Sequence, residues 1–597
     1  MSALDWVIVA VYFVASAGIG IAYAKRAGSS LEEYFLSGRS LPWWLAGTSM
    51  VATTFAADTP LAVTELVARN GIAGNWLWWN MAFGGVLTVF FFARLWRRAG
   101  ILTDVEFTEL RYSGRPAAFL RGFRALYLGI FMNCVIMGWV NLAMGTILEG
   151  MFGIPKHQVL LYVGLALLIT ALYSALSGLW GVALTDAFQF VLAMVGTITL
   201  AFVVLPKVGG VAGLQAALPP ATFNLLPSIG TGVAGAAGAF ALSFSAFLAY
   251  IAVQWWASWY PGSEPGGGGY IAQRMMSAKD EKHSLFATLW FTIAHYCVRP
   301  WPWILVALAS LVLYPDLAAD QKRLGYVMAM RDHLPAGLKG MLVASFFAAY
   351  MSTIATQLNW GTSYVINDFY KRFLKPNAGE RDLVLTSRIT TLLVMVLSLG
   401  VTLVLDTISG AWAFIIEAGA GLGLVLILRW FWWRISAWSE IAAMVAPLVT
   451  YGCLRLFTSI AFPDTLFVIV GVTTAAWLLV TFLTRPVDEA TLHAFYRRVH
   501  PGGPGWAPIA RALPEVRPDA GMARLLGNWL AGVVLVYSAL FAVGKLLLGD
   551  YRLAAVFLST GALAVGVIYR NLARGTGADS GAAVGAGEPG GSSRLAG

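Results

Sequence analysis

The chain has 597 residues, of which 58% are hydrophobic and only 12% carry a charge. A water-soluble globular protein has roughly 25% charged residues, so this class is excluded. The net charge of +10 does not indicate nucleic-acid binding, because the basic residues cluster in alternate connectors between apolar runs.

Apolar runs of about 20 residues recur along the chain, which is the length that crosses a bilayer as a helix. In hydrocarbon each run must satisfy its own backbone hydrogen bonds, and the sequence lacks the ten-residue alternation of a β-barrel. It therefore predicts an all-α polytopic membrane protein with about fifteen transmembrane helices. The expected spans are residues 5–24, 41–69, 75–98, 118–150, 158–177, 179–206, 237–260, 284–314, 338–370, 384–405, 409–433, 437–457, 463–484, 524–546 and 552–570.

The run at 5–24 is predicted to be a retained leading helix, because Lys25 and Arg26 follow it and no basic residue precedes it. The next ten spans are numbered core helices 1 to 10. The basic connectors, such as Arg97-Arg98 and Lys371-Arg372, are expected to face the cytoplasm. This predicts a multi-pass protein of the cytoplasmic (inner) membrane with its N-terminus outside and its C-terminus in the cytoplasm.

Four parts follow from the composition along the chain. Residues 1–484 hold the leading helix, the ten core helices and two further helices. Residues 485–523 are rich in proline and charge and form a cytoplasmic connector, and residues 524–571 form two extra transmembrane helices. Residues 572–597 are rich in Gly, Ala and Ser and are predicted to be a disordered cytoplasmic tail.

Redox and haem chemistry find no support in the sequence. Cys134, Cys297 and Cys453 lie in or beside apolar runs without metal-ligand spacing, and we interpret them as packing residues. Of the six histidines only His295 lies well within a span, so the paired histidines of an intramembrane haem are missing. We expect no covalent chemistry, and the protein is predicted not to be an enzyme.

Two core helices carry internal breaks. Core helix 1 contains Pro60, which removes a backbone donor, and Asp58, a charge within an apolar span. Core helix 6 runs into residues 255–269, which end in four glycines. Breaks five helices apart are typical of a transporter built from two inverted repeats around a central site. The alternative interpretation is that Pro60 is a simple kink and the glycines form a loop.

Core helix 8 carries a stripe of small and hydroxyl-bearing residues. Ala349, Ser352, Thr353 and Thr356 share one helical face. Sodium prefers oxygen ligands, and hydroxyls together with carbonyls freed at a helix break replace its hydration shell. The alternative is packing, since small residues permit close helix contact and hydroxyls bond back to the preceding turn.

Two further charges lie within apolar spans, Asp186 in core helix 5 and Glu417 in core helix 10. A charge in the bilayer is costly, which favours a functional role, and the alternative is a structural ion pair.

Several separated motifs resemble the sodium:solute symporter family, the sodium-coupled galactose, proline, sialic-acid and related carriers. They are Glu-Tyr-Phe-Leu-Ser-Gly-Arg at 33–39 and the following residues to 44, residues 174–189, Gln273-Arg274, and Ala-Ala-Tyr-Met-Ser-Thr at 348–353 within 339–372. The resemblance covers roughly residues 5–485. It implies a LeuT-type fold, in which core helices 1 to 10 form two inverted repeats of five, with one leading helix and about four trailing helices.

The resemblance also implies a sodium site between core helices 1 and 8. Its ligands are the backbone oxygens of Ala52, Phe55 and Ala349 and the hydroxyls of Ser352 and Thr353. Some relatives have a second sodium position, which here maps onto Asp186 and Thr356. This chain has Ala355 where a serine is expected, so the second ion is a separate hypothesis.

The expected solute site lies beside the breaks in core helices 1 and 6. Its candidate residues are Asp58, Thr59, Trp78, Trp255 and Glu417. A carboxylate pairs with an ammonium group and a tryptophan ring faces a cation, which favours an amine-bearing solute over a sugar. Aromatic residues also serve as interface anchors, which is the alternative for the tryptophans.

These observations predict a secondary transporter that couples sodium entry to uptake of a small polar solute by alternating access. The alternatives are a proton-coupled carrier that uses Asp58, a transporter-like membrane sensor and a sodium channel.

Overall fold

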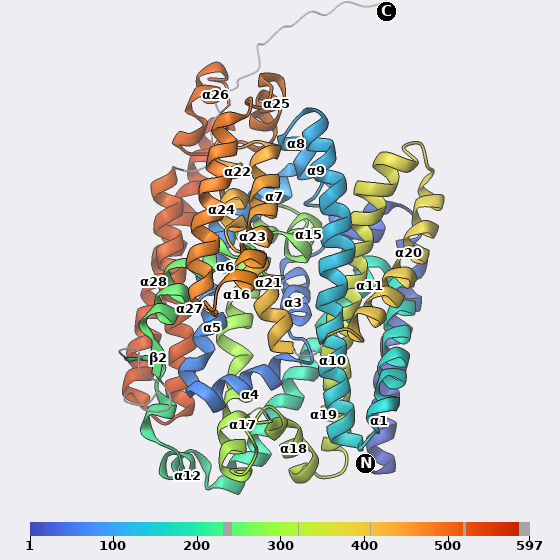
Figure 1. Ribbon diagram of the computed structural model, residues 1–597, viewed down its shortest axis with the longest axis vertical. Helices are drawn as coiled ribbons and strands as arrows, with labels where there is room; N and C mark the ends of the chain where they lie inside the picture. Colours follow the sequence, from blue (N-terminus) through green and yellow to red (C-terminus); the bar gives the residue numbers. More distant parts are fainter. Residues whose placement is uncertain (231–240, 320, 406–407, 517–520, 584–597) are drawn as a thin grey trace, which may run out of the picture.

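The computed structural model describes residues 1–230, 241–319, 321–405, 408–516 and 521–583. In these ranges the chain forms a bundle of helices along one long axis, with the N-terminus and the connector helices at opposite ends (Figure 1). Ten of the described helices, rather than the predicted fifteen, are long and apolar enough to cross a membrane, because α11 (Lys156–Val204) joins two predicted spans and breaks divide others into short helices. The predicted all-α membrane architecture is confirmed.

The first half of the bundle holds the leading helix and core helices 1 to 5. Its elements are α1 (Ala3–Ala27), α2 (Leu31–Leu36), η1 (Ser37–Arg39), α3 (Trp43–Thr53), α4 (Thr59–Asn70), η2 (Ile72–Asn75), α5 (Trp76–Trp79), α6 (Ala82–Leu87), η3 (Thr88–Phe92), α7 (Ala93–Ala99), α8 (Phe107–Arg111), α9 (Gly114–Leu126), η4 (Tyr127–Met132), α10 (Asn133–Phe152) and α11 (Lys156–Val204).

The second half holds core helices 6 to 10 after a short connection. Its elements are η5 (Leu205–Val208), α12 (Gly210–Ala217), η6 (Pro220–Phe223), the parallel strands β1 (Ser228–Gly230) and β2 (Ala241–Ser243), α13 (Phe244–Leu248), η7 (Ala249–Gln254), α14 (Trp255–Ala257), α15 (Gly269–Ser277), α16 (Glu281–Ile293), η8 (Ala294–Val298), α17 (Pro300–Leu313), α18 (Leu324–His333), α19 (Leu338–Ser363), η9 (Tyr364–Leu374), α20 (Glu380–Thr402), α21 (Ile408–Ala418) and α22 (Leu422–Phe431).

The trailing elements are α23 (Ala437–Phe457), α24 (Asp464–Leu483), α25 (Glu489–Val499), η10 (Pro504–Trp506), α26 (Ala507–Ala512), α27 (Met522–Leu547) and α28 (Tyr551–Ala583). The connector at 485–523 thus carries the short helices α25 and α26. Helix α28 continues to Ala583, so helix covers the first part of the segment predicted to be a disordered tail, and residues 584–597 lie outside the described residues.

Core helices 4 and 5 are predicted as two spans that meet at residue 178, and the structure turns at this residue. Helix α11 contains both spans and loses helical geometry only at Gly178, whose φ is +56°. A Cβ atom there would lie 2.8 Å from the carbonyl oxygen of Tyr34. Glycine is therefore favoured here both by the positive φ and by the close approach of the Tyr34 backbone.

The breaks in core helices 1 and 6 are confirmed, and core helix 10 has a break that the sequence did not predict. Residues 419–421 separate α21 from α22, and Gly421 has a φ of +90°. The Trp259 N–H donates to the Gly419 carbonyl at 3.1 Å, and the Gly421 N–H donates to the Ala257 carbonyl at 2.9 Å. The two interrupted helices therefore satisfy each other's backbone groups.

The predicted span at 237–260 differs most from the structure. Residues 237–240 lie outside the described residues, and the helical part is limited to 244–257. Beyond Ala257 the chain is not helical until Gly269, because Pro261, Pro265 and the glycine run interrupt it.

The two extra helices lie side by side on one flank of the bundle, opposite α1 and α20 (Figure 1). Helix α27 is the one that docks on the core. Its Tyr537 hydroxyl donates to the Trp79 carbonyl at 2.8 Å. The indole N–H of Trp529 donates to the Phe83 carbonyl, and that of Trp301 donates back to the Leu540 carbonyl of α27. The Trp301 ring packs on Gly544, where a Cβ atom would lie 2.0 Å from it.

This contact yields a prediction for Gly544→Val. The new side chain overlaps the Trp301 ring, so the unfolding free energy should fall by about 1–3 kcal/mol, measured as a lower melting temperature of the purified protein. Gly566→Val in α28 is the matched control, since a Cβ atom there meets nothing within 4 Å. Equal melting temperatures for the two variants would contradict the docking of α27.

Candidate functional site

The break in core helix 1 lies at the centre of the bundle. Helix α3 ends at Thr53 and α4 begins at Thr59, so residues 54–58 are not helical. Pro60 lies in the first turn of α4, where a missing N–H costs no hydrogen bond. Helices α11 and α19 pack directly against α3. The break therefore faces the helices that carry Asp186 and the hydroxyl stripe.

A small cavity, too narrow to hold a water molecule, lies between α3, α11 and α19. Ala52 and Phe55 line it from the broken helix, and Ala349 and Ser352 line it from α19. Four of the five residues from which the resemblance builds a sodium site thus surround one space.

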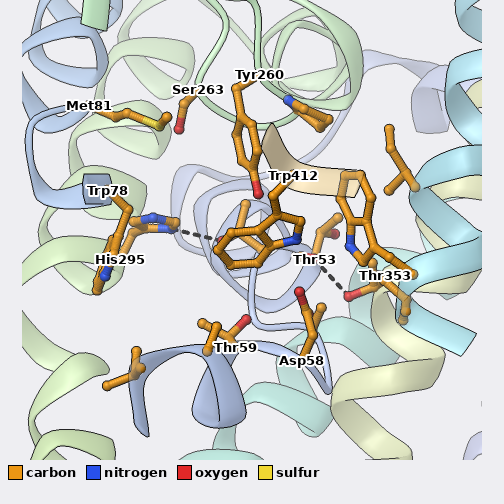
Figure 2. A pocket seen from close by; sticks show the side chains of 18 of the residues that line it. Thr53, Asp58, Thr59, Trp78, Met81, Tyr260, Ser263, His295, Thr353 and Trp412 are labelled. Atoms are coloured by element: carbon orange, nitrogen blue, oxygen red, sulfur yellow. Dashed lines mark hydrogen bonds between the residues drawn. The ribbon is translucent and has the colours of Figure 1, made fainter. Parts of the chain in front are cut away.

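Thr353, the fifth residue, joins α19 to the break. Its hydroxyl lies 2.8 Å from the Thr53 carbonyl and 3.1 Å from the Ala349 carbonyl and has one hydrogen to donate. A dashed line in Figure 2 marks the bond to Thr53. Ser352 lines the small cavity, while Thr353 lines a larger central cavity next to it.

Asp186 on α11 is held by hydroxyls from two other helices. Ser49 donates to one carboxylate oxygen at 2.5 Å and Ser352 donates to the other at 2.6 Å. The guanidinium of Arg274 on α15 lies 3.6 Å from the same carboxylate, and all four side chains are buried. Asp186 therefore connects the serine of the small cavity to a buried cation.

Arg274 also occupies the space beside Thr356. Its guanidinium donates to the Thr356 hydroxyl at 2.6 Å, and Thr356 lies 2.9 Å from the Thr53 hydroxyl. Asp186 and Thr356, the residues of the hypothetical second sodium position, are thus bridged by a positive side chain.

The central cavity has a volume of about 100 Å³. One water needs roughly 10–15 Å³ on this scale, so the cavity has room for a small solute. Figure 2 shows Asp58, Thr59 and Trp78 around it, together with Tyr260 and Trp412. Three of the five candidate solute residues therefore lie together at the break.

Asp58 is the polar group of this cavity that most needs a partner. Its carboxylate is 98% buried, since only 2% of the residue is exposed. Its Oδ1 atom has no hydrogen-bond partner among the described residues, and neither does Oε1 of Gln357 on α19. Unsatisfied buried acceptors are costly, so both oxygens are suited to a solute that donates hydrogen bonds.

Trp255 and Glu417 are not among the described residues that line the cavity. Trp255 packs against Phe83 and Trp529 on the α27 side of the bundle. Glu417 accepts hydrogen bonds from Arg455 and Thr465, which supports the structural ion pair that the sequence left open.

Arg299, which is not among the residues predicted for the solute site, lines the cavity from the position directly before α17. It donates to the Thr54 hydroxyl at 3.2 Å and lies 3.1 Å from Nε2 of His295. A guanidinium only donates, so Nε2 accepts and the neutral imidazole carries its proton on Nδ1, 2.9 Å from the Thr54 hydroxyl. A charged residue within the span at 284–314 was the available signal.

A polytopic helical protein whose interrupted helices surround a central polar cavity has the architecture of a secondary transporter. The sequence profile of the sodium:solute symporter family matches residues 34–446, and the chain belongs to this family. It is a sodium-coupled transporter and not an enzyme.

Known relatives cover most of the chain. A sodium/glucose cotransporter of Vibrio parahaemolyticus is 26% identical and covers 75% of this chain and 84% of its own length. A sodium/mannose cotransporter of Bos taurus is 26% identical, covering 78% of this chain and 80% of its own. The solved structure of a Na+-coupled sialic acid symporter superimposes with a TM-score of 0.65 at 17% identity, covering 82% and 99%, which supports the LeuT-type fold.

The Asp186 contacts predict a stability effect. In Asp186→Ala the guanidinium of Arg274 stays buried without its carboxylate, so the unfolding free energy should fall by about 3–5 kcal/mol, measured by thermal unfolding of the purified protein. Adding Arg274→Met removes the unpaired charge and should restore most of the loss. A double variant no more stable than Asp186→Ala would contradict this pairing.

Proposed function

We propose that this transporter binds sodium at the break in core helix 1 and a small polar solute in the adjoining central cavity, and moves both inward by alternating access. The observation that carries the proposal is the convergence of Ala52, Phe55, Ala349 and Ser352 on one small cavity, while the next residue, Thr353, donates to the Thr53 carbonyl at the break. Interrupted helices supply carbonyl oxygens at such a point, and alternating access around it requires no covalent step.

The proposed ligands are the backbone oxygens of Ala52, Phe55 and Ala349 and the hydroxyls of Ser352 and Thr353. Each hydroxyl donates its single hydrogen to a protein oxygen, Ser352 to Asp186 and Thr353 to a backbone carbonyl. The lone pairs of both hydroxyl oxygens remain available to a cation. In this arrangement Asp186 orients Ser352 and does not itself contact the ion.

We further propose one sodium ion per cycle. Arg274 bridges Asp186 and Thr356, and a second cation there would meet a buried guanidinium. One ion is energetically sufficient. Moving one charge through a potential on the order of 150 mV yields about 3.5 kcal/mol, and a tenfold sodium gradient adds about 1.4 kcal/mol, which together support more than about a thousandfold accumulation.

The sodium site is tested by Ser352→Ala and Thr353→Ala. Each variant removes one neutral oxygen ligand, so the sodium concentration for half-maximal binding should rise at least about tenfold, measured with radioactive sodium on the purified protein. Ser363→Ala is the control, because this buried α19 hydroxyl donates to the Trp360 carbonyl in the preceding turn and has no other hydrogen-bond partner in the described part of the chain. Sodium affinity equal to that of the control in both variants would refute the assignment.

The solute that best matches the cavity carries an ammonium group. Asp58 and Trp78 both line the cavity, and one oxygen of the buried Asp58 carboxylate has no hydrogen-bond partner among the described residues. Arg299 lines the same cavity and provides a positive charge, so a solute with an ammonium and an acidic group matches both charges. We therefore propose a zwitterionic amine as the solute class, although the relatives described above are named for sugars.

Asp58→Asn tests the solute assignment. The substitution removes the negative charge but keeps the shape of the side chain. The solute concentration that gives half-maximal uptake should therefore rise at least about tenfold, while the sodium affinity stays within about twofold of the wild-type value. The measurement is sodium-driven uptake into proteoliposomes of labelled proline, choline, glucose and myo-inositol. The control is Glu65→Gln, a carboxylate of α4 that pairs with Arg69 outside the cavity.

Each alternative has its own outcome in this assay. Preference of the wild-type protein for glucose or myo-inositol would contradict the zwitterion. Uptake driven by a proton gradient without sodium, and lost in Asp58→Asn, would instead establish the proton-coupled mechanism.

We also propose the inner membrane as the location, with the N-terminus outside and the C-terminus in the cytoplasm. The support is the distribution of basic residues. Arg97, Arg98 and the connector helix α25 with Arg497 and Arg498 gather at the end of the bundle opposite the N-terminus (Figure 1).

A further inference from the structure

A second cavity, of about 540 Å³, lies at the connector end of the bundle, away from the central cavity. Three membrane helices contribute their ends to it. Arg94 and Arg98 lie on the last two turns of core helix 2, Leu285 on the first turns of α16, and Leu525 on the first turn of α27. Since all three spans begin or end here, the cavity lies at the depth of the membrane–water boundary.

The lining has a charged and an apolar part. Among the described residues, the charged part contains four basic side chains and two carboxylates: Arg94, Arg98, Lys282, Arg524, Asp280 and Glu281. The apolar part includes Phe90, Leu285, Phe431 and Leu525. A ligand that fits both parts has a negative head and an apolar body.

Arg94 is the side chain that points to a ligand. Its neighbour Arg98 is engaged, because it forms a bidentate pair with Glu281 at 2.6 and 2.8 Å. Arg94 has a buried Nε atom with no hydrogen-bond partner among the described residues. A guanidinium that lines a cavity and has no carboxylate partner among the described residues is suited to an anionic ligand, which its terminal nitrogens can bind.

The surroundings of the cavity favour a lipid over a free anion. Phe286, next to Leu285, is 45% exposed and Leu526, next to Leu525, is 43% exposed. Large apolar side chains at this depth of a membrane protein face the acyl chains of the bilayer. A free phosphate ion would leave the apolar part of the cavity without a partner.

We propose that this cavity binds an anionic phospholipid, with its phosphate at Arg94 and Lys282 and an acyl chain along Phe90, Leu285 and Leu525. Basic pockets between membrane helices are suited to such headgroups, and each nearby Lys or Arg contributes about fivefold to affinity. The lipid contacts core helices 2 and 7 and both extra helices, since Asn528 and Asn571 also line the cavity. It thereby links the α27–α28 pair to the transporter core.

The test uses the full-length protein, purified and delipidated in detergent. Its melting temperature is measured against added dioleoyl-phosphatidylglycerol, dioleoyl-phosphatidylcholine or inorganic phosphate. We expect a saturable rise with phosphatidylglycerol, and no comparable rise with phosphatidylcholine or with phosphate at the same concentration.

Two variants locate the site. Arg94→Gln should raise the phosphatidylglycerol concentration that gives half-maximal stabilisation about fivefold. Lys282 is exposed, so Lys282→Gln replaces this variant if Arg94→Gln fails to fold, with the same expected change. Arg115→Gln is the control, an exposed arginine at the start of α9 that does not line the cavity, and should stay within about twofold.

Three outcomes would overturn the proposal. Equal stabilisation by phosphatidylcholine removes the charge requirement, and equal stabilisation by inorganic phosphate identifies a free-anion site. Phosphatidylglycerol binding that is the same in Arg94→Gln, Lys282→Gln and Arg115→Gln places the lipid elsewhere. None of these results bears on the sodium site, because the cavity shares no residue with it.

Discussion

The requirement that every backbone N–H and C=O in the bilayer has a partner shapes this structure more than any other constraint. It limits helix breaks to places where other parts of the chain meet them. The interrupted core helices 6 and 10 bond to each other through Trp259, Gly419 and Gly421. The break in core helix 1 is met by the hydroxyl of Thr353. Because the breaks need one another and α19, they gather at the centre of the bundle, and the cavities form where they gather.

Buried charged side chains also require partners. Asp186 accepts hydrogen bonds from two serine hydroxyls and pairs with Arg274. Glu417 pairs with Arg455 and accepts a hydrogen bond from Thr465. Asp58 differs from both, since one of its carboxylate oxygens has no partner among the described residues. A buried charge whose partner has to come from a ligand indicates binding, whereas a buried charge with protein partners indicates architecture.

Much of this was predictable from the sequence because membrane spans and helix breaks are local features. Apolar length gave the spans, and Pro60 with Asp58 located the central break. Partner choice is not local, so the sequence places Glu417 at the solute site, whereas in the folded chain Glu417 pairs with Arg455 on the next helix. Trp255 was misplaced for the same reason, because its packing partner Trp529 belongs to α27. The charge of Arg299 and the glycines of core helix 10 are local features that indicate a site and a break, whereas the contact of Arg274 with Thr356 is visible only in the folded chain.

The central claim is that sodium and solute bind to adjoining sites of one protein, and thermodynamic linkage tests it most directly. A library of small polar solutes is screened for thermal stabilisation of the purified protein, in sodium and in potassium of equal ionic strength. Two ligands that bind cooperatively stabilise the native state more together than separately. The account predicts at least one solute whose stabilisation is clearly larger in sodium. Solute stabilisation of equal size in both salts would contradict it.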